Sequence, residues 1–299
     1  MTSAAKPLQK AELKKRILGV CKNALKDLRR VLYFNTLYVP FAKKKHANIN
    51  KLTQRSQKHT YTAFNRSPGQ LDALCGPVME VLRGLDQGST LQINILAGSI
   101  GAEAYTVSST LASRFPNLSF HIHCCDLHEE TIARSKSGRY TKQEVHGLGV
   151  TDTFINKTFN RENNEYFVKP ELKEKITFFP ANIVTDDLEA MYPKADIVLM
   201  QNVLFHLDDE QAEQAFENGL KTAKESSVVF IDGMSLDMRG KLVERNKMVP
   251  LNYRVKEIHE YARRHVPDDW WKYYYGMEPY SFLTSNKLNR YSTIFVRRV

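Results

Sequence analysis

The chain has 299 residues, of which 42% are hydrophobic and 25% are charged, as is ordinary for a globular protein with a sizeable core. Its longest apolar runs, 197–200 and 228–231, are far too short to span a bilayer. The N-terminus has lysines but no apolar stretch followed by a small-residue cleavage site, so no secretory signal is expected. The composition therefore excludes an integral membrane protein, and we expect a cytoplasmic one.

Positive charge is concentrated at the N-terminus. Residues 1–58 carry 15 Lys and Arg against Glu12 and Asp27, a net charge of +13, so the remaining 28 basic and 31 acidic residues give −3. Between residues 11 and 34 apolar residues recur at helical spacing among the basic ones, which predicts an amphipathic helix. Its stripe consists of Leu13, Ile17, Cys21, Leu25, Leu28 and Leu32. Three interpretations stay open: a solvated helix, an arm for an anionic partner, and a lid that packs its stripe on the following domain, which we favour.

The four cysteines give no sign of a metal site. Cys21, Cys75, Cys124 and Cys125 form no C-x-x-C pair and have no histidine at ligand spacing. We therefore expect reduced thiols and no bound metal.

From residue 68 onward the sequence alternates between helical and strand patterns. The pattern predicts strands at 91–96, 119–125, 175–179, 196–200, 227–231 and 290–297, and helices at 102–115, 128–136 and 208–224. Such alternation is typical of an α/β fold, in which a doubly wound parallel sheet is covered by helices on both faces. We expect residues 59–299 to form this domain behind the basic segment 1–58, with the ligand at the carboxyl ends of the strands.

The first predicted strand leads into a glycine turn, with Gly98 and Gly101 spaced G-x-x-G, and then Glu103 in the first helical turn. A dinucleotide site would show G-x-G-x-x-G and bind phosphate at the helix N-terminus. An acidic residue in that turn suits a cationic ligand better, although the loop could equally be a plain structural turn. Asp126 ends the next strand, where a carboxylate can accept hydrogen bonds from ribose hydroxyls or cap the following helix.

Asparagines stand just past the next two strands. Asn182 follows the strand at 175–179, and Asn202 follows the strand at 196–200. With Glu103 and Asp126 they place four polar residues at four successive strand ends, where the ligand crevice of such a sheet lies. His206 comes shortly after and is either a packed histidine or a group of the site.

Three motifs carry a resemblance to a known family. Residues 101–106, Gly-Ala-Glu-Ala-Tyr-Thr, are similar to its G-E-E-P-Y-S, and residues 201–208, Gln-Asn-Val-Leu-Phe-His-Leu-Asp, to its R-N-V-L-I-Y-F-D. Residues 60–66 keep the threonine, one phenylalanine and the arginine of its N-E-T-x-F-F-R. Residues 138–140 and 166–172 resemble the small β-subdomain that the family inserts, here 139–178. From about residue 60 to 237, the chain thus resembles the CheR-type chemotaxis protein methyltransferases, which methylate receptor glutamates.

The resemblance implies a class I, Rossmann-like methyltransferase that uses S-adenosylmethionine. It implies that Glu103 meets the methionine ammonium, Asp126 the ribose and Asn182 the adenine edge. The expected cofactor contacts are Thr62, Arg66, Ala97, Gly98, Glu103, Asp126, Leu127, Asn182, Ile183, Asn202, Val203 and Leu204, and the catalytic candidates are Arg66 and His206.

Departures from the family pattern bear on the methyl acceptor. Residues 1–58 lack the pattern of the receptor-binding helical domain, and His206 stands where the family has tyrosine. An insertion at 234–285 precedes the last strand, and its aromatic residues are expected to wall an acceptor pocket. They are Trp270, Trp271, Tyr273, Tyr274, Tyr275 and Tyr280. We favour an unidentified small-molecule acceptor with His206 as general base, because an ionised carboxylate needs no base; the alternatives are protein carboxyl methylation and a non-catalytic cofactor-binding module.

Overall fold

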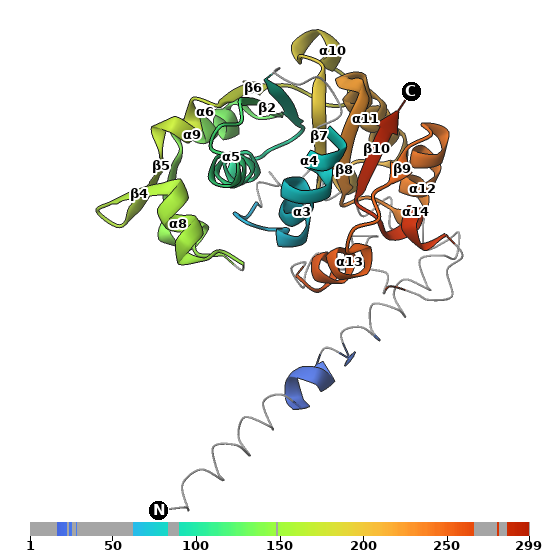
Figure 1. Cartoon of the computed structure of the whole chain (residues 1–299), viewed down its shortest axis with the longest axis horizontal. Coiled ribbons are helices and arrows are strands. Elements are labelled where there is room, and N and C mark those ends of the chain that lie inside the picture. The colour runs from blue at the N-terminus through green and yellow to red at the C-terminus, as the bar shows by residue number, and fades with distance from the viewer. Residues whose placement is uncertain are drawn as a thin grey trace, which may run out of the picture.

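The computed structural model describes residues 17–22, 24–25, 28, 62–82, 90–147, 149–265, 280 and 286–298. A seven-stranded sheet with the order β6-β2-β1-β7-β8-β10-β9 forms the centre of the domain (Figure 1). Its strands are β1 Leu91–Ile95, β2 Phe120–Asp126, β6 Ile176–Pro180, β7 Ala195–Gln201, β8 Ala223–Asp232, β9 Val249–Pro250 and β10 Ile294–Arg298.

Five of these strands, from β6 to β8, run parallel, while β10 runs antiparallel to β8 and to β9. The core of β7 reads as an unbroken apolar run, Ile197–Met200, because parallel strands are buried on both faces. The strand order reverses between β1 and β7, which is where doubly wound sheets bind ligands. The structure therefore confirms the predicted Rossmann-like sheet and adds an antiparallel edge.

Helices cover both faces of the sheet. One face packs against α3 Pro68–Ala73, the π-helical turn η1 Leu74–Val78, α4 Met79–Leu82, α5 Ala102–Arg114 and α6 Glu129–Ser137. The other face packs against α10 Leu188–Met191, α11 Asp209–Lys221 and α12 Leu236–Arg245. Side chains alternate along each strand, so neighbours such as Ile197 and Val198 enter opposite core layers.

Local capping fixes the ends of these helices. The Asp208 carboxylate accepts the Gln211 N–H at 3.0 Å, and the Gln211 side chain accepts the Asp208 N–H at 3.5 Å, which together form a capping box at the start of α11. Helix α6 ends at Gly138, whose φ of 63° is left-handed and suits glycine.

A second, three-stranded antiparallel sheet lies within the region expected to form the small subdomain. Its order is β3-β5-β4, with β3 Arg139–Thr141, β4 Phe159–Glu162 and β5 Glu165–Val168, and the short helices α7 Lys142–Val145, α8 Asp152–Thr158 and α9 Pro170–Lys173 lie around it. The Phe64 ring packs edge-on against Tyr140 and Phe159, with centroids 4.9 and 5.1 Å apart. The small sheet thereby holds the segment that enters the domain.

The chain between β8 and β10 forms α12, β9, α13 Val255–Arg264 and α14 Lys287–Tyr291. Helix α13 packs on α3, and a guanidinium nitrogen of Arg254 lies 2.8 Å from a carboxylate oxygen of Asp72. The last strand begins at Ile294 rather than at the predicted 290, because α14 occupies residues 287–291.

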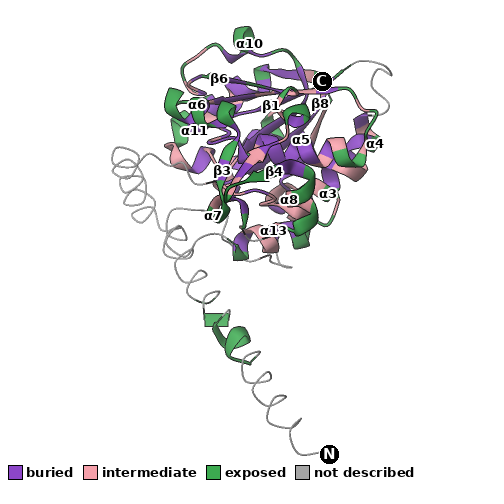
Figure 2. Ribbon diagram, turned by 90° about the vertical axis from the view of Figure 1, so that its left-hand side faces the viewer, coloured by how far each residue is buried: buried purple, intermediate pink, exposed green. Residues whose placement is uncertain are grey.

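The described residues of the basic N-terminal segment are helical, and their side chains are exposed, as Figure 2 shows. The exposed apolar residues are Ile17, Leu18, Val20, Leu25 and Leu28, at 54 to 68%. For these residues the expectation that the apolar stripe packs on the domain is wrong. No helix in the described part of the chain is long and apolar enough to cross a membrane.

Candidate active site

A cavity opens at the carboxyl ends of β1, β2 and β7, next to the point where the strand order reverses. Its empty volume is about 970 Å³ when the space open to solvent is included. Of the residues expected from the sequence, it is lined by Thr62, Arg66, Ala97, Gly98, Glu103, Asp126, Asn202, Val203 and His206. Segments far apart in the chain therefore meet in one place.

The loop between β1 and α5 forms one wall of the cavity. Ala97, Ser99 and Gly101 have left-handed φ values of 58°, 52° and 86°. A Cβ at Gly98 would lie 2.1 Å from the Cys124 sulfur, so only glycine lets the loop lie this close to β2. The wall presented to a ligand is therefore mostly backbone.

Asp126 ends β2 beside this loop. One carboxylate oxygen accepts the Ser99 N–H at 2.9 Å and the other accepts the His128 N–H at 3.4 Å, while burial raises the pKa of the carboxyl group. The N-cap of α6 is His128, so Asp126 does not cap that helix as one interpretation expected. A carboxylate has about four lone-pair sites, so these two bonds leave capacity for ligand hydroxyls.

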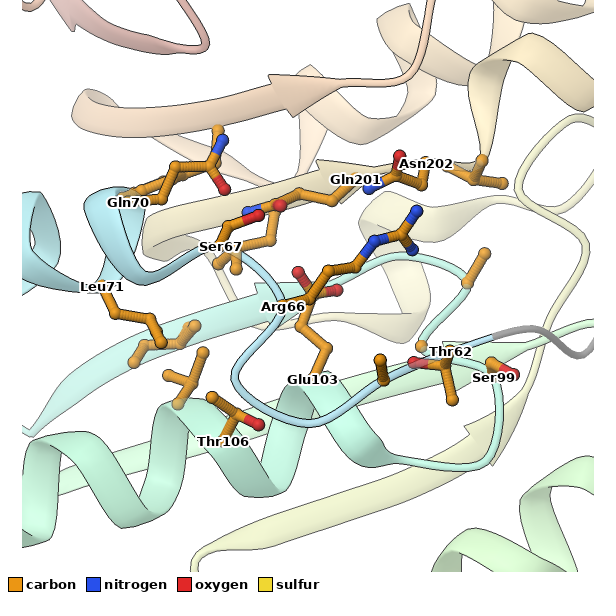
Figure 3. Close-up of a pocket in the computed structure, with 18 of the residues that line it drawn as sticks. Thr62, Arg66, Ser67, Gln70, Leu71, Ser99, Glu103, Thr106, Gln201 and Asn202 are labelled. Carbon is orange, nitrogen blue, oxygen red and sulfur yellow. The ribbon is translucent and has the colours of Figure 1, made fainter. Parts of the chain in front are cut away.

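Glu103 lies in the first turn of α5 and points into the cavity toward Arg66, as Figure 3 shows. Burial raises the pKa of Glu103 to about 7, the positive charge of Arg66 opposes the rise, and the Asp232 carboxylate adds to it. A carboxylate in such surroundings is stabilised by a further cation. An ammonium group fits this position, whereas a phosphate does not.

Arg66 and Thr62 belong to the segment that precedes α3. Between them, Phe64 is buried, and the Asn65 N–H donates to the Thr106 hydroxyl of α5 at 3.1 Å. The Asn65 side chain also donates to the Gly149 carbonyl. These contacts hold the backbone of the segment between Thr62 and Arg66, both of which line the cavity.

The end of β7 supplies the opposite wall. Asn202 has a left-handed φ of 55°, and its N–H donates to the Asp232 carbonyl at 2.9 Å. A Cβ at Gly233 would lie 2.5 Å from the Asn202 Cα, so glycine is required where β8 ends beside β7. The 3-10 helix η2, Leu204–His206, follows, and the His206 ring packs on Phe205 with centroids 4.0 Å apart.

Four expected cofactor residues lie outside the lining. Leu127, the residue after β2, is 56% exposed, and the Asn182 side-chain oxygen accepts the Val184 N–H at 2.9 Å. Ile183 and Leu204 have side chains buried in the core, which leaves only their backbone for a ligand.

Several polar lining residues were not expected as site residues: Ser67, Gln70, Ser99, Thr106 and Gln201. Gln70 is 2% exposed; its amide nitrogen donates to the Thr293 hydroxyl at 2.8 Å, and its oxygen has no partner among the described residues. Only the helical period of α3, which places Gln70 beside Leu71 and Leu74, could have indicated that it faces inward.

The aromatic residues of the insertion are mostly outside the described residues, namely Trp270, Trp271, Tyr273, Tyr274 and Tyr275. Tyr280 does not line the cavity and packs on Tyr291, with ring centroids 4.7 Å apart.

A family model described as the CheR methyltransferase, SAM binding domain, matches residues 60–255. The sheet and the site define an S-adenosylmethionine-binding domain of the class I methyltransferase type. The chain belongs to the CheR methyltransferase family, as a divergent member, and S-adenosylmethionine is its cofactor.

Two curated relatives are similar at low identity. An uncharacterized 104.1 kDa protein in the hypE 3′ region of Rhodobacter capsulatus is 25% identical over 179 residues, 58% of this chain and 18% of the relative. The probable biofilm formation methyltransferase WspC of Pseudomonas aeruginosa is 23% identical over 205 residues, 68% of this chain and 48% of the relative. The chain thus spans less than half the length of either relative.

Solved structures of methyltransferases also resemble the chain. Magnesium protoporphyrin IX methyltransferase from Synechocystis PCC 6803 has 15% identity and a TM-score of 0.36, with 62% of this chain and 71% of that one covered. The plantazolicin methyltransferase BpumL has 13% identity and a TM-score of 0.35, with 84% and 71% covered.

Proposed function

We propose that the protein is an enzyme that transfers a methyl group from S-adenosylmethionine to an uncharged small-molecule nucleophile. The observation that carries this proposal is the composition of the cavity lining, in which we distinguish by residue type a charged part and a neutral part. The charged part holds Arg66, Glu103 and Asp126. The neutral part holds Ser67, Gln70, Gln201, Asn202 and His206, with apolar walls at Leu71, Leu74, Ile93, Val107, Ile197, Leu199 and Phe230.

The charged part is suited to the cofactor. We assign Glu103 to the ammonium group, Asp126 to the ribose hydroxyls and Arg66 to the carboxylate, since each pairing brings opposite charges or a donor and an acceptor together. We assign the adenine to Leu127 and Asn182, which lie outside the lining and follow the paired ends of β2 and β6. The cofactor supplies a methyl group on a positively charged sulfur, and the task of these residues is to hold it in line with the acceptor.

The neutral part is suited to an acceptor with an O–H or N–H group. Gln201 stands where the family motif has arginine, so among the described lining residues Arg66 alone carries a permanent positive charge. The Thr293 hydroxyl pairs with one of the two polar atoms of the Gln70 amide. Whichever way the amide is turned, its second polar atom is left for a ligand. We assign to His206, which lines the cavity, the proton that a hydroxyl or amine acceptor loses.

The proposal is tested with methyl-labelled cofactor, the full chain and panels of phenols, primary amines and carboxylic acids. Label transferred to a phenol or an amine stays attached after mild base, whereas a methyl ester releases labelled methanol. His206→Gln should lower kcat by roughly 10²- to 10⁴-fold, as for loss of a general base, while the Kd for S-adenosylhomocysteine stays unchanged. Base-labile label as the main product would contradict the proposal.

Methylation of a protein carboxylate is the second candidate, and membership in the CheR family favours it. It requires Arg66 to orient the acceptor carboxylate as well as to face Glu103. Base-labile label on a polypeptide would identify this activity. Binding of S-adenosylhomocysteine without transfer to any acceptor would indicate a cofactor-binding module.

We also propose a division of the chain into a basic helical segment, residues 1–58, and a methyltransferase domain, residues 59–299. The net charge of +13 on the first part, against −3 on the second, supports an anionic partner for the segment.

A further inference from the structure

The N-terminal segment combines exposed apolar side chains with a strongly basic sequence. Its described apolar side chains are exposed: Leu18 and Val20 each at 68%, and Leu25 at 67%. Single exposed apolar residues are normal on a protein surface, but a contiguous group of them marks a surface that binds something. The partner must therefore offer apolar surface.

Basic residues alternate with these apolar ones in the sequence, and Lys22 is the one among them that the structure describes. At the helical angle per residue, Ile17, Leu18, Val20, Leu25 and Leu28 fall within an arc of about 160°. Extended over the helix that the sequence predicts for 11–34, the same period places Lys15, Arg16, Lys22, Lys26, Arg29 and Arg30 outside that arc and Lys14 inside it. The partner must therefore also carry negative charge next to its apolar surface.

We propose that this helix docks on an anionic lipid bilayer, lying in the interface with its apolar side toward the acyl chains and its lysines and arginines among the headgroups. Nucleic acid meets the charge requirement but offers the apolar arc no continuous surface. A bilayer meets both, and a basic amphipathic helix of this kind is the form that interfacial anchors take. The inference concerns the N-terminal surface and does not depend on the methyl acceptor.

The test is co-sedimentation of the full chain with vesicles. We expect binding to phosphatidylcholine vesicles that contain about one-third phosphatidylglycerol, with a partition coefficient roughly tenfold or more above that for phosphatidylcholine alone. Binding should weaken steeply between low and high salt, because salt screens the attraction between exposed charges and the headgroups. Equal binding to both vesicles, or none to either, would overturn the proposal.

Two substitutions and a matched control separate the helix from the domain. Leu18→Glu and Leu25→Glu should each lower the partition coefficient about tenfold, because each places a charge in the apolar arc. Val249→Glu is the control, since Val249 is 61% exposed in β9 of the domain and should leave binding unchanged. An equal loss in the control would show that the helix is not the docking surface.

Size-exclusion chromatography distinguishes the rival occupants. If the apolar arc covers a second copy of the chain, the lipid-free protein is a dimer and Leu18→Glu makes it a monomer. If it serves an acidic macromolecule, a polyanion such as heparin binds and vesicles do not. Either result would overturn the bilayer assignment.

Discussion

The surroundings of Glu103 give its carboxyl group a raised pKa. It lies in the first turn of α5, where burial makes its charged form costly, and Arg66 recovers only part of that cost. The group is therefore partly protonated near neutral pH until a cation arrives. Binding of an ammonium group should stabilise the ionised form and release a proton.

Cofactor affinity should consequently depend on pH. Because the pKa of Glu103 is about 7 in the free protein, affinity for S-adenosylhomocysteine should rise roughly eightfold between pH 6 and 7.5 and then level off. Glu103→Gln cannot ionise, so its weaker affinity should be flat over this range. Isothermal titration in two buffers of different ionisation enthalpy measures the released proton. A flat profile in the parent would show that Glu103 does not meet the ammonium group.

Asp126 should contribute to affinity through hydrogen bonds to the ribose. Asp126→Ala removes a charged acceptor and should cost about 1.5–3 kcal/mol of binding free energy, a rise of roughly tenfold to a hundredfold in Kd. The control is Asp209→Ala, an exposed carboxylate in the first turn of α11 that does not line the cavity. Calorimetry that finds Asp126→Ala within twofold of the parent would show that the ribose lies elsewhere.

Much of the candidate site could be predicted because its residues directly follow strands or glycine turns. Glu103, Asp126 and Asn202 are of this kind, since the carboxyl ends of parallel strands meet at one edge. Gln70 and Ser67 could not be found, because they reach the cavity through the packing of α3 on the sheet. That packing depends on tertiary contacts and leaves no short motif.

The contact between α3 and α13 joins elements far apart in the chain. A Cβ on Gly69 of α3 would lie 2.8 Å from Ile258 Cγ1 of α13, so the two helices touch at a position that accepts no side chain. The ion pair of Arg254 with Asp72 adds an exposed contact to the same pair of helices, worth little by itself. Close packing thus sets the position of α3, and with it one wall of the cavity.

Gly69→Ala should therefore destabilise the protein even though alanine favours helices. The overpacked methyl group should lower the free energy of unfolding by about 1–3 kcal/mol, and adding Ile258→Ala should relieve part of the clash. Gly240→Ala is the matched control, because no atom lies within 4 Å of its Cβ position in α12, and it should raise stability by about 0.5–1 kcal/mol. Urea unfolding measures all four proteins. A stabilising Gly69→Ala would show that α13 can move away freely.

The parallel strands of the sheet could be predicted from the sequence, whereas its antiparallel edge could not. Strands β1, β2, β6 and β7 carry recurrent apolar residues and are bounded by turns, and the structure confirms them close to their expected limits. The late start of β10 escaped prediction because Lys287–Tyr291 forms the short helix α14, which packs on α12 and α13. Helices this short owe their stability to packing rather than to sequence pattern.

The net positive charge of the chain and its candidate active site belong to different parts of the sequence. The cavity is formed by residues from Thr62 onward, whereas the positive charge belongs to residues 1–58. The exposed apolar residues of the N-terminal helix do not contribute to the cavity lining. The two parts should therefore act independently toward the cofactor.

Deletion of residues 1–58 should leave the Kd for S-adenosylhomocysteine within about twofold of the full chain, since the described residues of this segment are exposed and do not line the cavity. Calorimetry measures the affinity, and thermal unfolding of the shortened protein controls for its integrity. A large loss of affinity in a well-folded shortened protein would show that the segment closes over the cofactor as a lid.

The hydrogen bond from Gln70 to Thr293 spans 223 residues of sequence. The bond joins α3 to the residue just before β10, so the cavity wall beside Gln70 stays incomplete until the ribosome has added Thr293. Synthesis proceeds at about 5–20 residues per second. Gln70 is therefore made on the order of ten seconds or more before Thr293. Ligand binding at this wall of the cavity then depends on the synthesis of Thr293, the later of the two residues.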